Sequence, residues 1–164
     1  MRSLFWIGLG LLVGVFDYTF AHHLTSFGLA PSLLFLTVVL AALLEDRKTS
    51  LIVGLVLGLV ADVMTASAFG VKTVTFTIIA IIVVVLRRNT ISYSIFLQIA
   101  AVVVATVITA IGTIFFIDYY GGNMNFSDCL LRWYLPFMVI NALVMPFFAF
   151  FIKKLHCKYI KYFD

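Results

Sequence analysis

The chain has 164 residues, of which 64% are hydrophobic and only 11% are charged, and its mean hydropathy is +1.19. So few polar side chains cannot cover a water-soluble globule, which predicts an integral membrane protein with a single domain, residues 1–164. The formal net charge of +4 does not indicate nucleic-acid binding, because the basic residues form short clusters at the ends of apolar runs, where they act as topology signals.

Six apolar runs predict a bundle of six transmembrane helices. They occupy residues 4–21, 27–44, 50–66, 70–86, 93–117 and 133–152. Pro31 interrupts the second run, and the apolar stretch after it is short enough to be re-entrant. The positions of the basic residues favour six crossings, because that layout leaves only Lys72 and Arg132 outside. Both termini are therefore predicted to be cytoplasmic, with the basic tail 153–164 along an anionic inner leaflet.

The first and third predicted helices share one pattern, a face of small residues that ends in an acid. The pattern is formed by Gly10, Gly14 and Asp17 in the first helix and by Gly54, Gly58 and Asp62 in the third. Small residues let another helix come close within a membrane, and an acid inside a span faces protein or water. Both faces are therefore predicted to pack against helices. The alternative for each acid is a position near the helix end, within reach of interfacial water.

A turn of small residues that ends at Gly70 joins the third and fourth predicted helices into a hairpin. Lys72 follows at the outer start of the fourth helix, and its long side chain can reach back toward the third. An unpaired carboxylate within the membrane costs at least about 2.5–3.5 kcal/mol on insertion scales. We therefore predict that polar neighbours hold Asp62 and that Lys72 is its charged partner.

The last predicted helix contains Asn141 and Pro146, which indicate an interhelical hydrogen bond beside a kink. The mixed-charge turn at 45–49 is interpreted as a solvated topology anchor without chemistry. Two His-containing pairs, His22-His23 and His156-Cys157, are poor chelates without further ligands at useful spacing. No metal site and no cofactor is predicted.

The pattern from Gly54 to Asp62 (G-x3-G-L-x-x-D), the turn to Gly70 and the pair of Asn141 and Pro146 resemble the MreD family of rod-shape-determining membrane proteins. The similarity is best from about residue 50 to 88. It implies a bacterial cytoplasmic-membrane subunit of the cell-elongation, peptidoglycan-synthesising machinery. The implied partners are the membrane-anchored periplasmic protein MreC, the MreB filament, and the RodA and penicillin-binding synthases.

The resemblance also implies a helical arrangement similar to the substrate-binding subunits of energy-coupling-factor vitamin transporters. Three functions therefore compete. A non-enzymatic scaffold is favoured because the chain has no P-loop, no helix-borne metal motif and no nucleophile–base spacing. A small-molecule-binding transporter subunit would line a pocket with Asp17, Asp62, Lys72 and Asn141. An intramembrane enzyme would use the two aspartates as a pair that shares one proton.

Overall fold

The described part of the chain is all-helical, as predicted. This computed structural model describes residues 2–24, 32–65, 70–88, 95–119 and 134–163, and no strand occurs among them. The helices are α1 (Arg2–Leu24), α2 (Leu33–Leu44), α3 (Arg47–Thr65), α4 (Val71–Arg88), α5 (Ile95–Tyr119) and α7 (Leu135–Phe163). Two bounds differ clearly from the predicted segments. Helix α2 begins only after Pro31 and Ser32, and α7 continues past the predicted end at 152 to include the basic tail.

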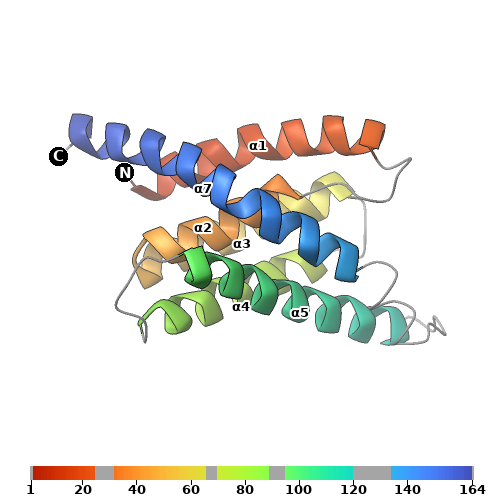
Figure 1. Ribbon diagram of the computed structural model, residues 1–164. Coiled ribbons are helices and arrows are strands. Elements are labelled where there is room, and N and C mark those ends of the chain that lie inside the picture. Colours follow the sequence, from red (N-terminus) through yellow and green to blue (C-terminus); the bar gives the residue numbers. More distant parts are fainter. Residues whose placement is uncertain (1, 25–31, 66–69, 89–94, 120–133, 164) are drawn as a thin grey trace.

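The helices form a bundle in which α2 and α3 lie between α1 on one side and α4 and α5 on the other, while α7 crosses one face (Figure 1). The start of α1 and the end of α7 lie at the same end of the bundle (Figure 1). We call this the basic end, because Arg47, Lys48, Arg87 and Lys154 lie on the helix ends that meet there. The opposite end, which holds Asp17 and Asp62, is the aspartate end.

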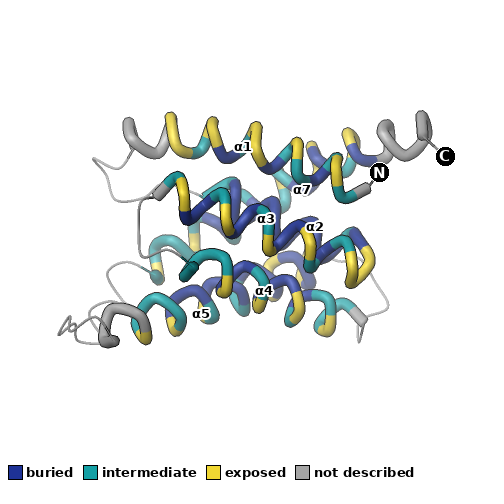
Figure 2. The backbone as a smooth tube through the Cα atoms, turned by 180° about the vertical axis from the view of Figure 1, so that it is seen from behind, coloured by how far each residue is buried: buried dark blue, intermediate teal, exposed yellow. Residues whose placement is uncertain are grey.

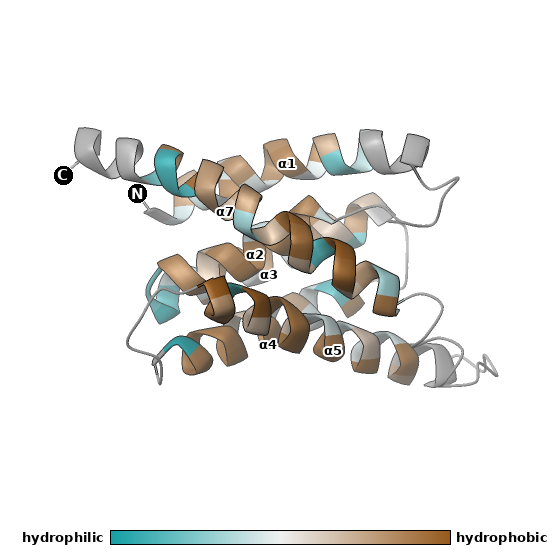
Figure 3. Cartoon of the chain, in the orientation of Figure 1, coloured by the Kyte–Doolittle hydropathy of each residue, from teal (hydrophilic) through white to brown (hydrophobic). Residues whose placement is uncertain are grey.

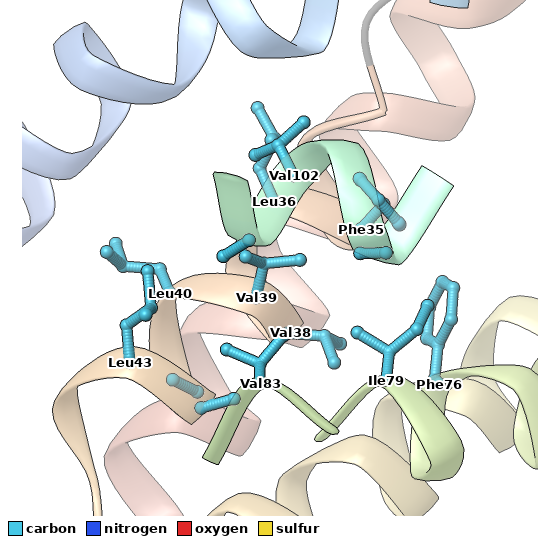
Figure 4. Packing of buried hydrophobic residues seen from close by; sticks show 14 of the residues in the cluster. Phe35, Leu36, Val38, Val39, Leu40, Leu43, Phe76, Ile79, Val83 and Val102 are labelled. Carbon is cyan, nitrogen blue, oxygen red and sulfur yellow. The ribbon is translucent and has the colours of Figure 1, made fainter. Parts of the chain in front are cut away.

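Helix α2 is the centre of the bundle. Every residue from Leu34 to Leu43 is buried, and α2 contacts all five other described helices. Its side chains meet Phe76, Ile79 and Val83 of α4 and Val102 of α5 (Figure 4). With 12 residues, α2 is about 18 Å long, which is shorter than the hydrocarbon core of about 30 Å. Both of its ends therefore need polar partners from the rest of the chain.

Apolar side chains cover the outside of the bundle, with large exposed groups such as Leu12 of α1, Phe96 of α5 and Phe147 of α7. Figure 2 shows the outward faces of the helices as exposed, and Figure 3 shows that hydrophobic residues dominate these helices. Two described helical stretches, Ile95–Phe115 and Leu135–His156, are long and apolar enough to cross a membrane by length and composition. These features are those of a helical membrane protein.

Candidate functional site

Asp62 is buried at the end of α3, where it caps the start of α4. Its carboxylate accepts hydrogen bonds from the backbone N–H groups of Gly70 (3.0 Å), Lys72 (2.9 Å) and Thr73 (3.0 Å), and also from the Thr73 hydroxyl. The first N–H groups of a helix have no partner within the helix, and the helix dipole favours a negative charge there. Asp62 supplies both the acceptors and the charge, so the third and fourth helices are joined at this point.

Lys72 does contact Asp62, although through its backbone and not through its ammonium group as predicted. The described residues include no ion pair between the two side chains, and the direct bond comes from the Lys72 N–H. Polar neighbours hold Asp62, as predicted, but they are the donors at the start of α4 and not the Lys72 side chain.

The small-residue face of α3 lies against α4 all along this hairpin. A Cβ added to Gly58 would come within 2.5 Å of the Thr73 Cα, and one added to Gly54 would lie 2.9 Å from the carbonyl oxygen of Phe76. Both contacts are with backbone, which cannot rotate away as a side chain can. Gly70 has a φ of +99°, a conformation that suits glycine, and its N–H points to Asp62. Gly54 and Gly58 therefore lie where α3 and α4 pack together, whereas Gly70 serves the turn between them.

Asp17 of α1 plays the corresponding part at the start of α2. Its carboxylate accepts hydrogen bonds from the Leu34 N–H and from the Ser32 hydroxyl, each at 3.2 Å. Ser32 is the N-cap residue of α2, and its hydroxyl also accepts from the Phe35 N–H. Asp17 is half-buried, and its carboxylate lies against the start of α2.

Asn141 of α7 holds the same end of α2 from another side. Its side-chain oxygen accepts a hydrogen bond from the Ser32 N–H at 3.1 Å, and its NH2 group donates to the carbonyl of Phe137 at 2.8 Å. This is the interhelical hydrogen bond that was predicted for Asn141. Pro146 lies inside α7, which continues through it.

The glycines of α1 bring that helix close to α2 and α3. A Cβ on Gly10 would lie 2.3 Å from a methyl carbon of Leu57 in α3, and one on Gly14 would lie 2.6 Å from a methyl carbon of Leu34 in α2. Each predicted small-residue face therefore makes a close helix crossing, and each ends in an acid that caps a neighbouring helix.

The basic end contains a second polar cluster, which the sequence interpretation missed. Glu45, predicted to be solvated, is only 3% exposed. One of its carboxylate oxygens accepts a hydrogen bond from the Trp6 indole N–H (3.0 Å) and lies 2.6 Å from the His156 ring nitrogen Nε2. The rings of Phe5 and Trp6 pack on the His156 ring, with centroids 5.8 and 5.5 Å away. The turn at 45–49 is thus not merely a solvated anchor.

The carbonyl groups at the end of α2 also have partners. Arg87 of α4 donates to the carbonyls of Leu43 (2.8 Å) and Glu45 (3.1 Å). The Ser50 hydroxyl lies within hydrogen-bonding distance of three carbonyls, those of Ala41, Glu45 and Asp46. Free carbonyl groups at a helix end are costly where water is absent, so Arg87 serves a purpose beyond marking topology.

These two clusters join helices through buried and half-buried polar side chains. Asp17 and Asp62 are each occupied by N–H and hydroxyl donors of a different helix. Two described hollows, one beside Thr106 and Met138 and one along the outer face of α1 from Gly8 to Thr19, have almost wholly apolar walls. No group of three metal-ligating side chains occurs among the described residues, while the side chains of His22, His23 and Cys157 lie outside that part of the chain.

Comparison with known proteins identifies the family of this chain. A family model described as rod shape-determining protein MreD matches residues 1–156, which is nearly the whole chain. No curated protein and no solved structure gives a significant match to the chain.

Proposed function

The chain belongs to the MreD family of rod shape-determining membrane proteins, and we propose that it serves this role as a non-enzymatic scaffold of the cell-elongation machinery. In this proposal it binds an MreC-type membrane-anchored protein and helps to bring the MreB filament together with the RodA and penicillin-binding peptidoglycan synthases. It resides in the bacterial cytoplasmic membrane.

The observation that carries the scaffold proposal is the use of the buried polar residues. Asp62, Asp17 and Asn141, which a transporter subunit or an enzyme would turn toward its substrate, are bonded to the backbones of neighbouring helices. Polar groups that are bonded in this way stabilise one arrangement of helices and leave few atoms free for a ligand. A rigid bundle with an apolar outer surface is suited to holding partner helices.

Six spans with both termini in the cytoplasm fit the contacts at the basic end. The start of α1, the end of α2, the end of α4 and the last part of α7 meet there through Trp6, Glu45, Arg87 and His156. Since α2 ends beside the start of α1, the second segment returns the chain to the side from which it began. This supports a crossing segment over a re-entrant one, and it groups the basic residues on one side, as expected for the cytoplasm.

The proposal is tested by isolating the tagged full-length protein from native membranes solubilised in a mild detergent. We expect the MreC-type protein and the wall synthases to be isolated with it, and an unrelated tagged multi-pass protein serves as the control. Isolation of an ATP-driven transport module, or of a tightly held small molecule without the elongation proteins, would instead favour the transporter subunit.

A further inference from the structure

Helix α2 is fastened at both ends to the same two helices. At the aspartate end, its first residues bond Asp17 of α1 and Asn141 of α7. At the basic end, Glu45 follows its last turn and bonds Trp6 of α1 and contacts His156 of α7. The three helices therefore form a closed frame in which α2 is the short central member.

The dimensions of the frame leave little freedom for either end to move alone. Trp6 and Asp17 are 11 residues apart in α1, or about 17 Å, and α2 itself is about 18 Å long. Between its fastened ends α2 is packed on every side, with Leu36, Val39 and Leu40 all 0% exposed (Figure 4). Closely packed interiors have low compressibility and pass on displacements, so a shift at one end of a short buried helix reaches the other.

The contacts at the two ends are hydrogen bonds, which are either formed or broken. The contacts with α7 join residues far apart in the sequence, 109 residues for Ser32 and Asn141 and 111 for Glu45 and His156. Outside these bonds, α1 and α7 meet through the rings of Phe5, Trp6 and His156 at the basic end. Loss of a bond at either end separates that end of α2 from α1 or from α7.

From this arrangement we propose that α2 acts as a strut that couples the two ends of the bundle, so that breaking the Ser32–Asn141 bond loosens the Trp6–Glu45–His156 cluster. Coupling between two sites is reciprocal, so breaking the Glu45–His156 contact loosens the start of α2 to a comparable degree. The inference concerns this chain alone. It is independent of which proteins the scaffold binds, and co-isolation of partners neither supports nor opposes it.

Trp6 provides a direct readout, since the chain contains only two tryptophans. In a Trp133→Phe background, Trp6 is the single tryptophan, and it is fully buried at the basic end. Asn141→Ala is the test variant at the far end. Leu143→Ala, at an exposed position two residues along the same helix, is the matched control. His156→Ala shows how Trp6 responds when its own cluster is disrupted directly.

We expect Asn141→Ala to raise the acrylamide quenching of Trp6 by about twofold or more and to shift its emission to longer wavelength, because local opening exposes buried groups. Leu143→Ala should leave both unchanged. If Asn141→Ala does not yield a folded protein, Asp17→Ala takes its place, because it removes the acceptor of the Leu34 N–H and the Ser32 hydroxyl at the same end of α2. Unchanged quenching of Trp6 in the folded variant, with a clear change for His156→Ala, would show that the two ends are not coupled.

The reverse direction is measured by hydrogen exchange of the first turn of α2. Glu45→Gln should speed the exchange of the Leu34 and Phe35 amides, whereas Asp46→Asn at the exposed neighbouring position should not. Faster exchange confined to the basic end of the Glu45→Gln protein would contradict the strut.

Discussion

Asp62 accepts two hydrogen bonds from Thr73, one from its backbone N–H at 3.0 Å and one from its hydroxyl, and thereby fixes the end of α3 to the start of α4. Both bonds go to the same carboxylate oxygen, while the Lys72 N–H donates to the other. A substitution at Asp62 therefore acts on the start of a helix and not on a single ion pair.

We predict that Asp62→Leu markedly lowers the amount of folded protein, because it leaves several half-buried donors without an acceptor, at up to about 1–3 kcal/mol for each unsatisfied group. Asp62→Asn should have an intermediate effect. Its single oxygen replaces one carboxylate oxygen, but its NH2 group cannot accept the hydrogen bond that the other carboxylate oxygen accepted. Size-exclusion profiles of the detergent-solubilised proteins measure this. A fully abundant Asp62→Asn protein that no longer restores cell shape would assign Asp62 a role beyond structure.

Gly58→Ala should destabilise the bundle, because the added Cβ would lie 2.5 Å from the Thr73 Cα. Overpacking of this kind costs about 1–3 kcal/mol. Gly8→Ala is the matched control, since nothing lies within 4 Å of a Cβ at that position. Thermal unfolding in detergent compares the two, and equal melting temperatures would mean that α3 and α4 are not in such close contact.

Gly70→Ala tests the backbone conformation and not the available space. Nothing lies within 4 Å of a Cβ at Gly70, yet its φ of +99° is unfavourable for residues with a side chain. We expect a loss of about 1–2 kcal/mol of stability for Gly70→Ala and a smaller loss for Gly70→Asn. The same melting experiment provides the measurement, and a larger loss for Asn than for Ala would rule out this explanation.

Glu45→Leu should lower stability much more than Asp46→Leu, although the two acids are neighbours. Replacing Glu45 removes the acceptor of the Trp6 indole N–H and the polar partner of the His156 ring, at about 1–3 kcal/mol for each buried polar group left unpaired. Asp46 is exposed, and substitutions at such positions usually stay within about 0.5 kcal/mol. Similar melting temperatures for the two variants would contradict the burial of Glu45.

The aspartate end was largely predictable from the sequence, because its signals are local. The spacing of Gly54, Gly58 and Asp62 places them on one helix face by geometry alone, and a membrane leaves such a face only protein or water to contact. The sequence did not reveal that the partners would be backbone N–H groups. Asp62 lies only 8 to 11 residues before its donors, but the way α4 packs against α3 decides which donors reach it.

The basic end could not be predicted in the same way. Glu45 stands in a run of charged residues, Glu-Asp-Arg-Lys, which is typical of a solvated turn. Its burial depends on Trp6 and His156, which are 39 and 111 residues away in the chain. The available signal was indirect: the apolar stretch after Pro31 is shorter than the hydrocarbon core, so its final carbonyl groups and the residue after them need polar partners on other helices.

The bond between Ser32 and Asn141 also bears on the order in which the protein can be completed. The ribosome makes Ser32 long before Asn141, so the start of α2 lacks one of its acceptors until the final helix has entered the membrane. His156, the partner of Glu45 at the other end, is made later still. A chain that stops before α7 therefore contains an unfinished central helix, and its defect lies at the core of the bundle and not only at its edge.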